Sequence, residues 1–475
     1  MATLISNHFM LHSATAERLY FDYAKNCPIV DYHCHINPRD IADDTKYENL
    51  TKLWLSGDHY KWRLMRAAGI EESLITGDAD DFEKFVAWAS VIERAVGNPL
   101  YHWSNLELYR YFDIKEPLGL SNAEQVWETV NEKLTSGLFS ARHFITSSNV
   151  NLLCTTDDPA DDLFSHRRIA EDLTFGPLVI PTFRPDRIVN IEKKDFSEYV
   201  GILSKAAEMP IQSWDDLKTA LHKRMDYFFD HGCRLADHAM ERFVFCDTSE
   251  AEVDRIFQKK MNAPDQPITY AEETIYKSAL LLYCASEYFV RGWTMQLHFG
   301  CRRNNNSLAM EQIGPDTGFD TIAGDSGFVT PLANFMDILQ LNNILPRMIL
   351  YSLNPNDDVI IDTLIGCFQD GSEAMKIQHG AAWWFNDNEQ GIKNHLRSLA
   401  AQGYLPGFIG MLTDSRSSLS YCRHEYFRRI LCDYLGGLVE EGKFHKNMEL
   451  LGSIVQDICY NNAQKIFLPS DESTF

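Results

Sequence analysis

The sequence predicts an α/β protein, built as a (β/α)₈ barrel of the TIM type with a large helical insertion after the first strand. Three observations lead to this prediction. Short apolar or β-branched runs that end in polar residues recur along the chain, helical stretches separate many of them, and the first run lies far from the second. Strands that alternate with helices are typical of a parallel β/α architecture.

Eight runs are candidates for the strands of this barrel. Their residue ranges are 29–35, 150–156, 178–184, 234–238, 293–299, 348–353, 377–382 and 408–414. The helix after the last run is the clearest of those expected, because Phe427, Ile430 and Leu431 begin an apolar stripe at helical spacing. We expect C-terminal helices over about 420–467.

The spacing of the runs predicts where the chain departs from a bare barrel. The segment 38–144 is rich in Trp, Leu and helix formers, so we expect a helical insertion on the first loop, at the catalytic face. A smaller insertion is expected over 303–343, where glycines crowd a loop. The 475 residues exceed the roughly 250 of a bare barrel. We expect a single domain over residues 1–475 that carries both insertions.

Charge and cysteine usage limit the class of protein. The formal net charge is −23, from 67 acidic and 44 basic residues, which disfavours binding to nucleic acids and anionic membranes. The 11 cysteines contain no C-x-x-C pair and lie mostly in apolar runs, as buried thiols do in a reducing compartment. Neither a signal peptide nor an apolar run of 18 residues is visible. We therefore expect a cytoplasmic protein.

The first run contains a candidate metal site. Side chains alternate across a strand, so Asp31, His33 and His35 share one face, and two imidazoles at this spacing can bind one ion. With 16 histidines in 475 residues, however, one such pair is close to what chance supplies. On spacing alone, a pair of surface or core histidines is the better explanation.

The last run strengthens the metal hypothesis. It ends at Asp414, and the first and last strands of a closed barrel are neighbours, so Asp414 should meet His33 and His35 at the mouth. His298 ends another run, halfway round the barrel. Two imidazoles and a carboxylate with an open position suit a divalent ion such as Zn²⁺. The alternative is that Asp414 caps a helix or pairs with Arg416.

Eight longer blocks carry a more specific signal. They are DYHCHINPRDIADD (31–44), LWLSGDHYKWRLMR (53–66), GNPLYHW (97–103), CTTDDP (154–159), PTFRPDR (181–187), ILYSLNPNDD (349–358), AAWWFND (381–387) and GMLTDSRSSLSYCRHEYFRRILC (410–432). From near residue 20 to about residue 467 the chain resembles the uronate isomerase family, a branch of the amidohydrolase superfamily. The resemblance implies the (β/α)₈ fold. It also implies interconversion of D-glucuronate with D-fructuronate and of D-galacturonate with D-tagaturonate in hexuronate catabolism.

The resemblance also implies a catalytic set. His33, His35 and Asp414 match the metal-site positions of the family, and Tyr60, with His59 beside it, matches a residue that reaches the substrate. Isomerisation moves a proton between C1 and C2 of the open-chain sugar, which requires a base and a group that polarises the carbonyl oxygen. We expect Asp414 to be the base, while Tyr60 and His59 handle the hydroxyl proton. His33 belongs to the catalytic set because, with His35, it would hold the polarising ion.

A second set of residues is expected to bind the sugar acid. Its members are Arg184, His298, Arg303, Trp384 and Arg416. Planar guanidinium groups match carboxylates, so Arg184 and Arg416 are expected to bind the distal carboxylate of the substrate. Trp384 is expected to cover one face of the sugar and exclude water.

Two other functions stay open on the sequence alone. A metal-dependent amidohydrolase or lactonase would use the same residues to activate water, and a non-catalytic sugar-acid binding protein would need none of this chemistry. Polar residues at several strand ends argue against the binding protein. For the preferred function we expect a homo-oligomer that acts on a small-molecule hexuronate, without nucleic-acid or membrane partners.

Other charged residues are expected to be structural. Asp157 and Asp158 stand before a proline, so they are expected to cap the helix after the second run. Arg423, Arg428 and Arg429 are expected to lie exposed on a helix, as solvated or interface charges.

Overall fold

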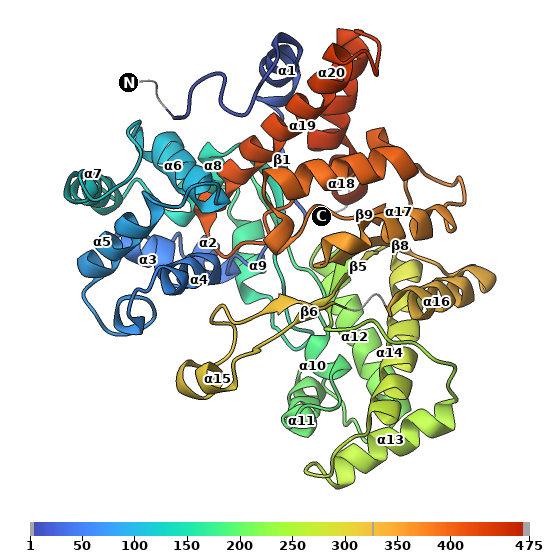
Figure 1. The fold of residues 1–475 in the computed structure, drawn as a ribbon. Helices are drawn as coiled ribbons and strands as arrows, with labels where there is room; N and C mark the ends of the chain where they lie inside the picture. The colour runs from blue at the N-terminus through green and yellow to red at the C-terminus, as the bar shows by residue number, and fades with distance from the viewer. Residues whose placement is uncertain (1–3, 325–326, 469–475) are drawn as a thin grey trace.

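The computed structural model describes residues 4–324 and 327–468 and has parallel strands at its centre (Figure 1). Seven of the eight expected runs contain a strand. These strands are β1 (Ile29–Asp31), β2 (Val150–Cys154), β3 (Leu178–Ile180), β4 (Leu235–Ala239), β5 (Thr294–Phe299), β8 (Arg347–Ser352) and β9 (Ile377–His379). They form two parallel sheets, with the orders β1-β2-β3 and β4-β5-β8-β9. The α/β class with parallel sheets is therefore confirmed.

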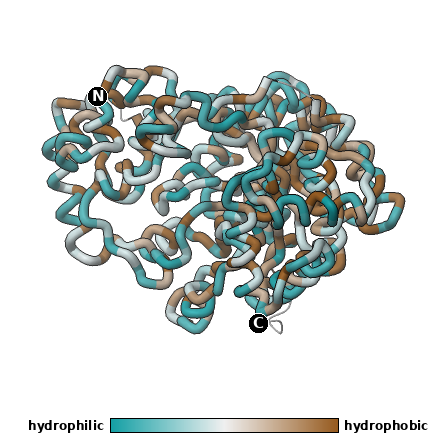
Figure 2. Tube along the Cα trace, turned by 90° about the horizontal axis from the view of Figure 1, so that it is seen from below, coloured by the Kyte–Doolittle hydropathy of each residue, from teal (hydrophilic) through white to brown (hydrophobic). Residues whose placement is uncertain are grey.

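The two sheets meet in chain order. Phe183, just after β3, forms a parallel bridge with Ala236 in β4. The strands are almost completely buried, and all six residues of β5 are inaccessible to solvent. Such continuous burial is expected for parallel strands that are covered on both faces. Figure 2 shows hydrophobic stretches interleaved with hydrophilic ones throughout the chain, as helices that pack on a central sheet require.

The eighth run, 408–414, forms no strand. Gly410 has a φ of 88°, and a Cβ atom at this position would lie 2.1 Å from the carbonyl oxygen of Ile458. This backbone conformation is open to glycine at little cost, and it interrupts the extended geometry that a strand ladder needs. The absence of a ladder here was not expected from the apolar pattern.

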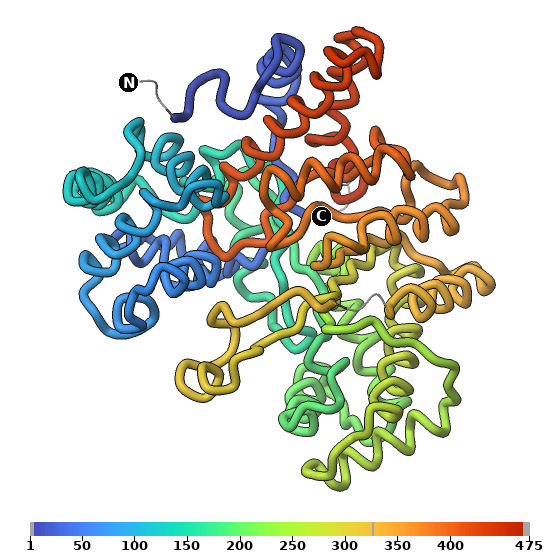
Figure 3. Tube along the Cα trace, in the orientation of Figure 1, coloured from blue at the N-terminus to red at the C-terminus, as the bar shows by residue number. Residues whose placement is uncertain are grey.

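Hydrogen bonds nevertheless place 408–414 between β9 and β1. The Gln378 side chain in β9 donates to the Gly407 carbonyl (3.0 Å) and accepts from the Ile409 amide (3.2 Å). On the other side, the Asp414 amide donates to the His33 carbonyl at 3.0 Å. Figure 3 shows this segment, coloured orange-red, beside the blue segment around β1 at the centre of the molecule.

Helices fill the long segment between β1 and β2. They are α2 (Pro38–Ala42), α3 (Leu50–Leu55), α4 (His59–Ala67), α5 (Asp81–Ile92), α6 (Pro99–Phe112), α7 (Ala123–Thr135) and α8 (Ala141–Ser147). In Figure 1 they gather on one side of the molecule. Most begin at an Asn, Asp or Ser whose side chain accepts a hydrogen bond from the first turn, for example Asp58 ahead of α4.

The remaining α-helices lie before β1, in the case of α1, or after the other strands. They are α1 (Ala14–Leu19), α9 (Phe164–Glu171), α10 (Asp186–Val189), α11 (Phe196–Ala206), α12 (Trp214–Asp230), α13 (Glu250–Asn262), α14 (Tyr270–Arg291), α15 (Ser307–Ile313), α16 (Val329–Leu341), α17 (Asp358–Gly366), α18 (Glu389–Gln402), α19 (Cys422–Glu440), α20 (Met448–Gln456) and α21 (Asn462–Phe467). The short antiparallel strands β6 (Cys301–Arg302) and β7 (Thr321–Ile322), which flank the projecting α15, were not predicted. Among the described residues, no helix is both long and apolar enough to cross a membrane.

The arginines of α19 are buried, so the expectation that they are exposed was wrong. Arg423, Arg428 and Arg429 are 5%, 5% and 2% exposed. Each guanidinium binds backbone carbonyls of a neighbouring segment, for example Arg428 those of Cys27 and Pro28. Their partners lie outside α19, and those of Arg428 and Arg429 are about 400 residues away, so the local pattern of the helix could not reveal them.

The expected capping role of Asp157 and Asp158 was also wrong. Helix α9 begins only at Phe164. Asp157 is buried and accepts hydrogen bonds from the Thr182 amide (3.1 Å) and the Thr155 hydroxyl (2.7 Å). Asp158 instead accepts from the Ala160 amide and the Tyr199 hydroxyl. These carboxylates join the loop after β2 to its neighbours.

Candidate active site

A cavity of about 1120 Å³ lies where the carboxyl ends of the parallel strands meet the helices of the first loop. All ten residues that the sequence nominated line it: His33, His35, His59, Tyr60, Arg184, His298, Arg303, Trp384, Asp414 and Arg416. They come from six separate regions of the sequence. The carboxyl ends of the strands are where enzymes with parallel β/α architecture place their sites.

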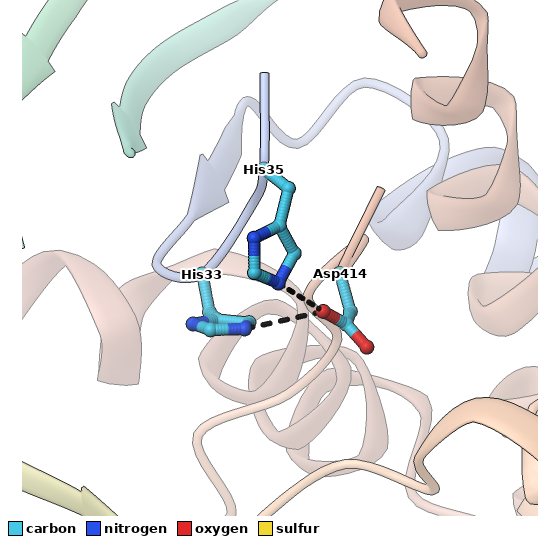
Figure 4. A group of neighbouring side chains, drawn as sticks. All are labelled: His33, His35 and Asp414. Carbon is cyan, nitrogen blue, oxygen red and sulfur yellow. Dashed lines mark hydrogen bonds and ion pairs between the residues drawn. The ribbon is translucent and has the colours of Figure 1, made fainter. Parts of the chain in front are cut away.

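Two imidazoles and one carboxylate converge at the base of the cavity. The Nε2 atoms of His33 and His35 lie 3.2 and 3.1 Å from the same Asp414 oxygen (Figure 4). The histidines follow β1 at alternate positions, and Asp414 ends the segment that lies beside β1. The predicted meeting of the two chain ends is therefore present in the structure.

Burial and charge set the protonation of this cluster. Burial opposes the charged form of His33, but Asp237 and Asp414 raise its pKa above the usual value. Burial lowers the pKa of His35 to about 4, so its imidazole is neutral near pH 7. Burial also opposes ionisation of Asp414, yet hydrogen bonds and charge from the two histidines hold its pKa well below the usual range.

Asp237 is a fourth member of this cluster, and it was not predicted from the sequence. It is completely buried in β4, and its two oxygens bind His298 Nδ1 at 2.7 Å and Arg184 Nη1 at 3.1 Å. Although burial opposes its ionisation, the charges of Arg184, His298 and His33 lower its pKa below the usual value. Strand alternation was the available signal, because Asp237 lies between Leu235 and Ala239 on one face of β4.

The ligand atoms of these residues form two overlapping groups that could hold a metal ion. One is His33, His35 and Asp414, and the other is His33, Asp237 and His298; within each group the ligand atoms lie within 4.8 Å of one another. Among the described residues, His33 Nδ1 and His298 Nε2 are buried without a hydrogen-bond partner, and Asp237 Oδ2 has an ion pair with Arg184 but no hydrogen bond. Buried polar atoms are seldom unsatisfied, and imidazole with carboxylate is a donor set that divalent ions accept. The residues present therefore fit a divalent cation.

Helix α4 brings His59 and Tyr60 to the cavity from the opposite side. Asp58 caps the helix by accepting hydrogen bonds from the Tyr60 and Lys61 amides, and it pairs with the buried Lys61 ammonium group. The His59 ring stacks on Tyr60 with 5.0 Å between centroids and meets the edge of Trp384 at 4.9 Å. This packing fixes the first turn of α4 over the cavity.

Both side chains are uncharged near neutral pH. Burial lowers the pKa of His59 below its usual value. Burial raises the pKa of the Tyr60 phenol well above its usual value, although the charge of Arg423 opposes this. Tyr60 is therefore a hydrogen-bond donor, and His59 can donate or accept a proton.

Three of the four arginines that line the cavity, those expected from the sequence, have different partners. Arg184 pairs with Asp186 and Asp237, and Arg303 pairs with Asp316 and Asp320. Arg416 is exposed and forms no ion pair with any residue in 4–324 or 327–468. Of these three arginines, Arg416 therefore has the charge that is most available to an anionic ligand.

A tryptophan that the sequence did not nominate supports Asp414. Trp383 donates its indole N–H to the second oxygen of Asp414 at 2.7 Å, and its ring meets His298 with 4.8 Å between centroids. Of the two adjacent tryptophans, only Trp384 had been expected in the site. Trp384 packs on His59 and Tyr60 instead, in a left-handed backbone conformation with φ of 50°.

Comparison with known proteins agrees with this geometry. The glucuronate isomerase family matches residues 1–467. The chain is 49% identical over 467 residues to the uronate isomerase of Endomicrobium trichonymphae, which covers 98% of this chain and 99% of the relative. It is 47% identical to the uronate isomerase of Bacillus pumilus, over 98% of this chain and 97% of that protein.

A solved structure gives the same result. The uronate isomerase of Thermotoga maritima superposes with a TM-score of 0.92 at 31% identity, over 98% of this chain and 100% of the other. Family match, sequence identity and fold agree over nearly the whole length. The chain belongs to the glucuronate isomerase family.

Proposed function

We propose that Asp414 transfers the proton by which this chain, a uronate isomerase, interconverts aldose and ketose hexuronates. The substrate pairs are D-glucuronate with D-fructuronate and D-galacturonate with D-tagaturonate. The observation that carries the proposal is the position of one Asp414 oxygen within 3.2 Å of two imidazoles, in a cavity that all the expected site residues line. A base in such a position contributes roughly 10²–10⁴-fold to a proton transfer.

The proton balance assigns roles to three side chains. Asp414, ionised because its pKa is low, takes the proton from C2 of the open-chain aldose and returns it to C1. In the same conversion O1 gains a proton and O2 loses one. Tyr60, which is neutral and lines the cavity, donates a proton to O1, and His59 accepts the proton that O2 loses. Transfer of that proton from His59 to Tyr60, on which its ring stacks, restores both groups.

We infer that the cation site is formed by His33, His35 and Asp414, and that the ion is Zn²⁺. When bound, such an ion polarises the substrate oxygens and stabilises the negative charge of the enediolate. His35, with its low pKa, is already in the neutral form that a metal ligand needs. Asp237 orients His298 and neutralises Arg184, and through His33 it borders the same site.

The distal carboxylate of the substrate binds to Arg416 in this proposal. Arg416 has no ion pair among the described residues, whereas Arg184 already serves two aspartates. In a chain of net charge −23, an anionic substrate requires such a local cation. Arg184, Arg303 and Trp384 then complete the binding surface.

We also propose that the strands close into one (β/α)₈ barrel in a single domain over residues 1–475, with α2–α8 as an insertion on the first loop. The order of the strands, the bridge between Phe183 and Ala236, and the hydrogen bonds of 408–414 to both β9 and β1 support this architecture. The expected homo-oligomer and cytoplasmic location stay predictions.

Incubation of the purified protein with D-glucuronate in D₂O, followed by proton NMR, tests the function. Ketose formation with deuterium incorporated at the carbon next to the carbonyl supports proton transfer by a protein base. Hydrolysis of added lactones or amides without ketose formation would instead support the amidohydrolase alternative.

A further inference from the structure

Asp414 occupies a backbone conformation that needs outside support. Its φ of 45° lies in the left-handed region, where a residue with a side chain costs free energy unless its surroundings over-determine it. The run 408–414 has no strand ladder, so regular hydrogen bonding does not provide this support. Another part of the molecule must therefore hold the peptide that precedes Asp414.

Two buried charged groups hold Thr413, the residue before Asp414, one at its amide and one at its carbonyl oxygen. Asp31 accepts from the Thr413 amide at 2.8 Å and from the Thr413 hydroxyl at 2.6 Å. Arg423 donates from Nη1 to the Thr413 carbonyl oxygen at 2.7 Å. Asp31 is 0% exposed and Arg423 is 5% exposed. Hydrogen bonds to charged groups are stronger than those between neutral groups, and burial excludes competing water.

Arg423 is itself fixed from two directions. Its Nη2 atom binds the buried carboxylate of Asp387, and its guanidinium lies 4.4 Å from the ring centroid of Trp103 in α6. Asp387 ends the short helical turn that begins at Trp384. The residue before that turn, Trp383, donates to the Asp414 carboxylate. Arg423 therefore joins the peptide before Asp414 to the segment that orients its side chain.

Neither Asp31 nor Arg423 lines the cavity, so neither touches the substrate. Both nevertheless bind Thr413, the residue that sets the direction of Asp414. We propose that Asp31 and Arg423 are positioning residues, which hold Asp414 in its left-handed conformation with its carboxylate directed at His33 and His35. The proposal rests on the role of Asp414 as the base.

The consequence concerns turnover more than substrate binding. Without Arg423 the Thr413 carbonyl loses its buried donor, and only the hydrogen bond from the Asp414 amide to the His33 carbonyl holds that peptide, so Asp414 can relax more readily to an ordinary negative φ. Its carboxylate then turns away from the imidazoles and from the carbon whose proton it takes. The arginines that bind the substrate carboxylate are unaffected, so KM should change little.

The chain offers a matched control on the same helix. Arg428, five residues after Arg423 on α19, is also 5% exposed and donates two hydrogen bonds to backbone carbonyls, those of Cys27 and Pro28. These carbonyls precede β1, at the end of the strand away from His33. Arg428→Met therefore removes a buried guanidinium of the same kind without touching Thr413.

The experiment compares Arg423→Met, Arg423→Lys and Arg428→Met by kcat and KM for D-glucuronate, melting temperature and bound metal content. Arg423→Met should lower kcat at least tenfold with KM within twofold, and Arg423→Lys, which keeps one donor, should recover part of the loss. Arg428→Met should lower the melting temperature and leave kcat within twofold. Wild-type kcat in folded Arg423→Met, or equal kinetic effects at both arginines, would overturn the proposal.

A milder pair of variants covers the case in which Arg423→Met does not fold. Thr413→Val removes only the hydroxyl bond to Asp31, and Thr413→Ser retains it. The valine should lower kcat several-fold and the serine should not, whereas equal kcat would count against positioning. Asp414→Asn separates the two proposals. If it retains turnover, the base assignment fails, and if only Asp414→Asn loses turnover, the positioning role alone fails.

Discussion

His33 lies between two aspartates that the chain holds in different ways. Asp237 lies opposite its Nδ1 at 3.9 Å, and Asp414 lies opposite its Nε2 at 3.2 Å. Asp237 belongs to a regular strand, where it pairs with Gln296 in the β4–β5 ladder. Asp414 has a left-handed backbone, no ladder and only tertiary hydrogen bonds to hold it.

The difference separates rigidity supplied by the fold from rigidity supplied by individual side chains. A residue in a ladder keeps its direction as long as the sheet exists, so substitution of one neighbour changes little. A residue outside the ladder depends on each of its partners. The comparison therefore predicts that kinetic sensitivity concentrates at Asp414 and its neighbours, while losses of stability concentrate at Asp237.

The largest effect is expected for Asp414→Asn. The amide cannot take a proton from carbon, so kcat for D-glucuronate should fall at least a hundredfold while the circular dichroism spectrum stays unchanged. Steady-state kinetics and a thermal melt measure both quantities. Turnover within tenfold of wild type would remove Asp414 from the base role.

Asp237→Asn should mainly destabilise the protein. It removes the completely buried counter-charge of Arg184, which then pairs with Asp186 alone, a loss that costs about 3 kcal/mol of unfolding free energy. A matched control is Asp362→Asn, because Asp362 is buried and binds His379 Nδ1 at 2.8 Å outside the cavity. Denaturant melts should show a similar loss for both variants, whereas kcat should fall about tenfold in Asp237→Asn only. Equal kcat in the two would mean that Asp237 serves stability alone.

Metal removal should affect the proposed cation site, which lies on the Asp414 side of His33. Dialysis against a chelator should lower the melting temperature, because an ion at a hundred times its dissociation constant contributes about 2.7 kcal/mol to the folded state. The shift should reverse with Zn²⁺ and be absent in a His35→Ala variant. An identical shift in His35→Ala would place the ion elsewhere.

A third aspartate, Asp157, extends the comparison to a buried carboxyl group that has no cationic partner. Burial raises the pKa of Asp157 to about 7, and burial lowers the pKa of its neighbour His166 to about 4, so that imidazole is neutral. Between the ordinary value near 3.8 and about 7, the native state binds more protons than the unfolded chain. The free energy of unfolding should therefore fall as pH rises, by about 2 kcal/mol between about pH 5 and pH 7.

Asp157→Asn tests directly whether this carboxyl group makes the free energy of unfolding fall as pH rises. The amide keeps an oxygen that can accept from Thr155 and Thr182 but has no proton to lose, so its melts should show a smaller fall over the same range. The measurement is urea unfolding at several pH values. Asp158→Asn is the control, because Asp158 adjoins Asp157 in the sequence but is half-exposed. Equal pH slopes for wild type and Asp157→Asn would contradict the raised pKa.

The sequence predicted the parts of this molecule that follow regular periodicity. Apolar or β-branched runs that end in polar residues located seven strands, and strand alternation placed His33 and His35 on one side. It could not show that 408–414 lacks a ladder, because the cause is the close approach of the Ile458 carbonyl to Gly410. That contact joins residues which no local pattern connects.

The site was predictable to a similar extent. Family resemblance and strand ends nominated the residues that line the cavity, since ligand-facing positions carry recognisable residue types. The supporting residues were missed or misplaced. Arg423 was expected in solvent, and Asp237 and Trp383 were not considered, because their importance comes from partners that only tertiary structure brings together.

The span of 381 residues between His33 and Asp414 has a consequence during synthesis. A nascent chain presents its imidazole pair long before the carboxylate has left the ribosome. Contacts of such long separation form late, because loop closure must precede them. The centre is therefore completed only after residue 414 has left the ribosome, and a product truncated before that residue would retain the histidines yet be catalytically inert.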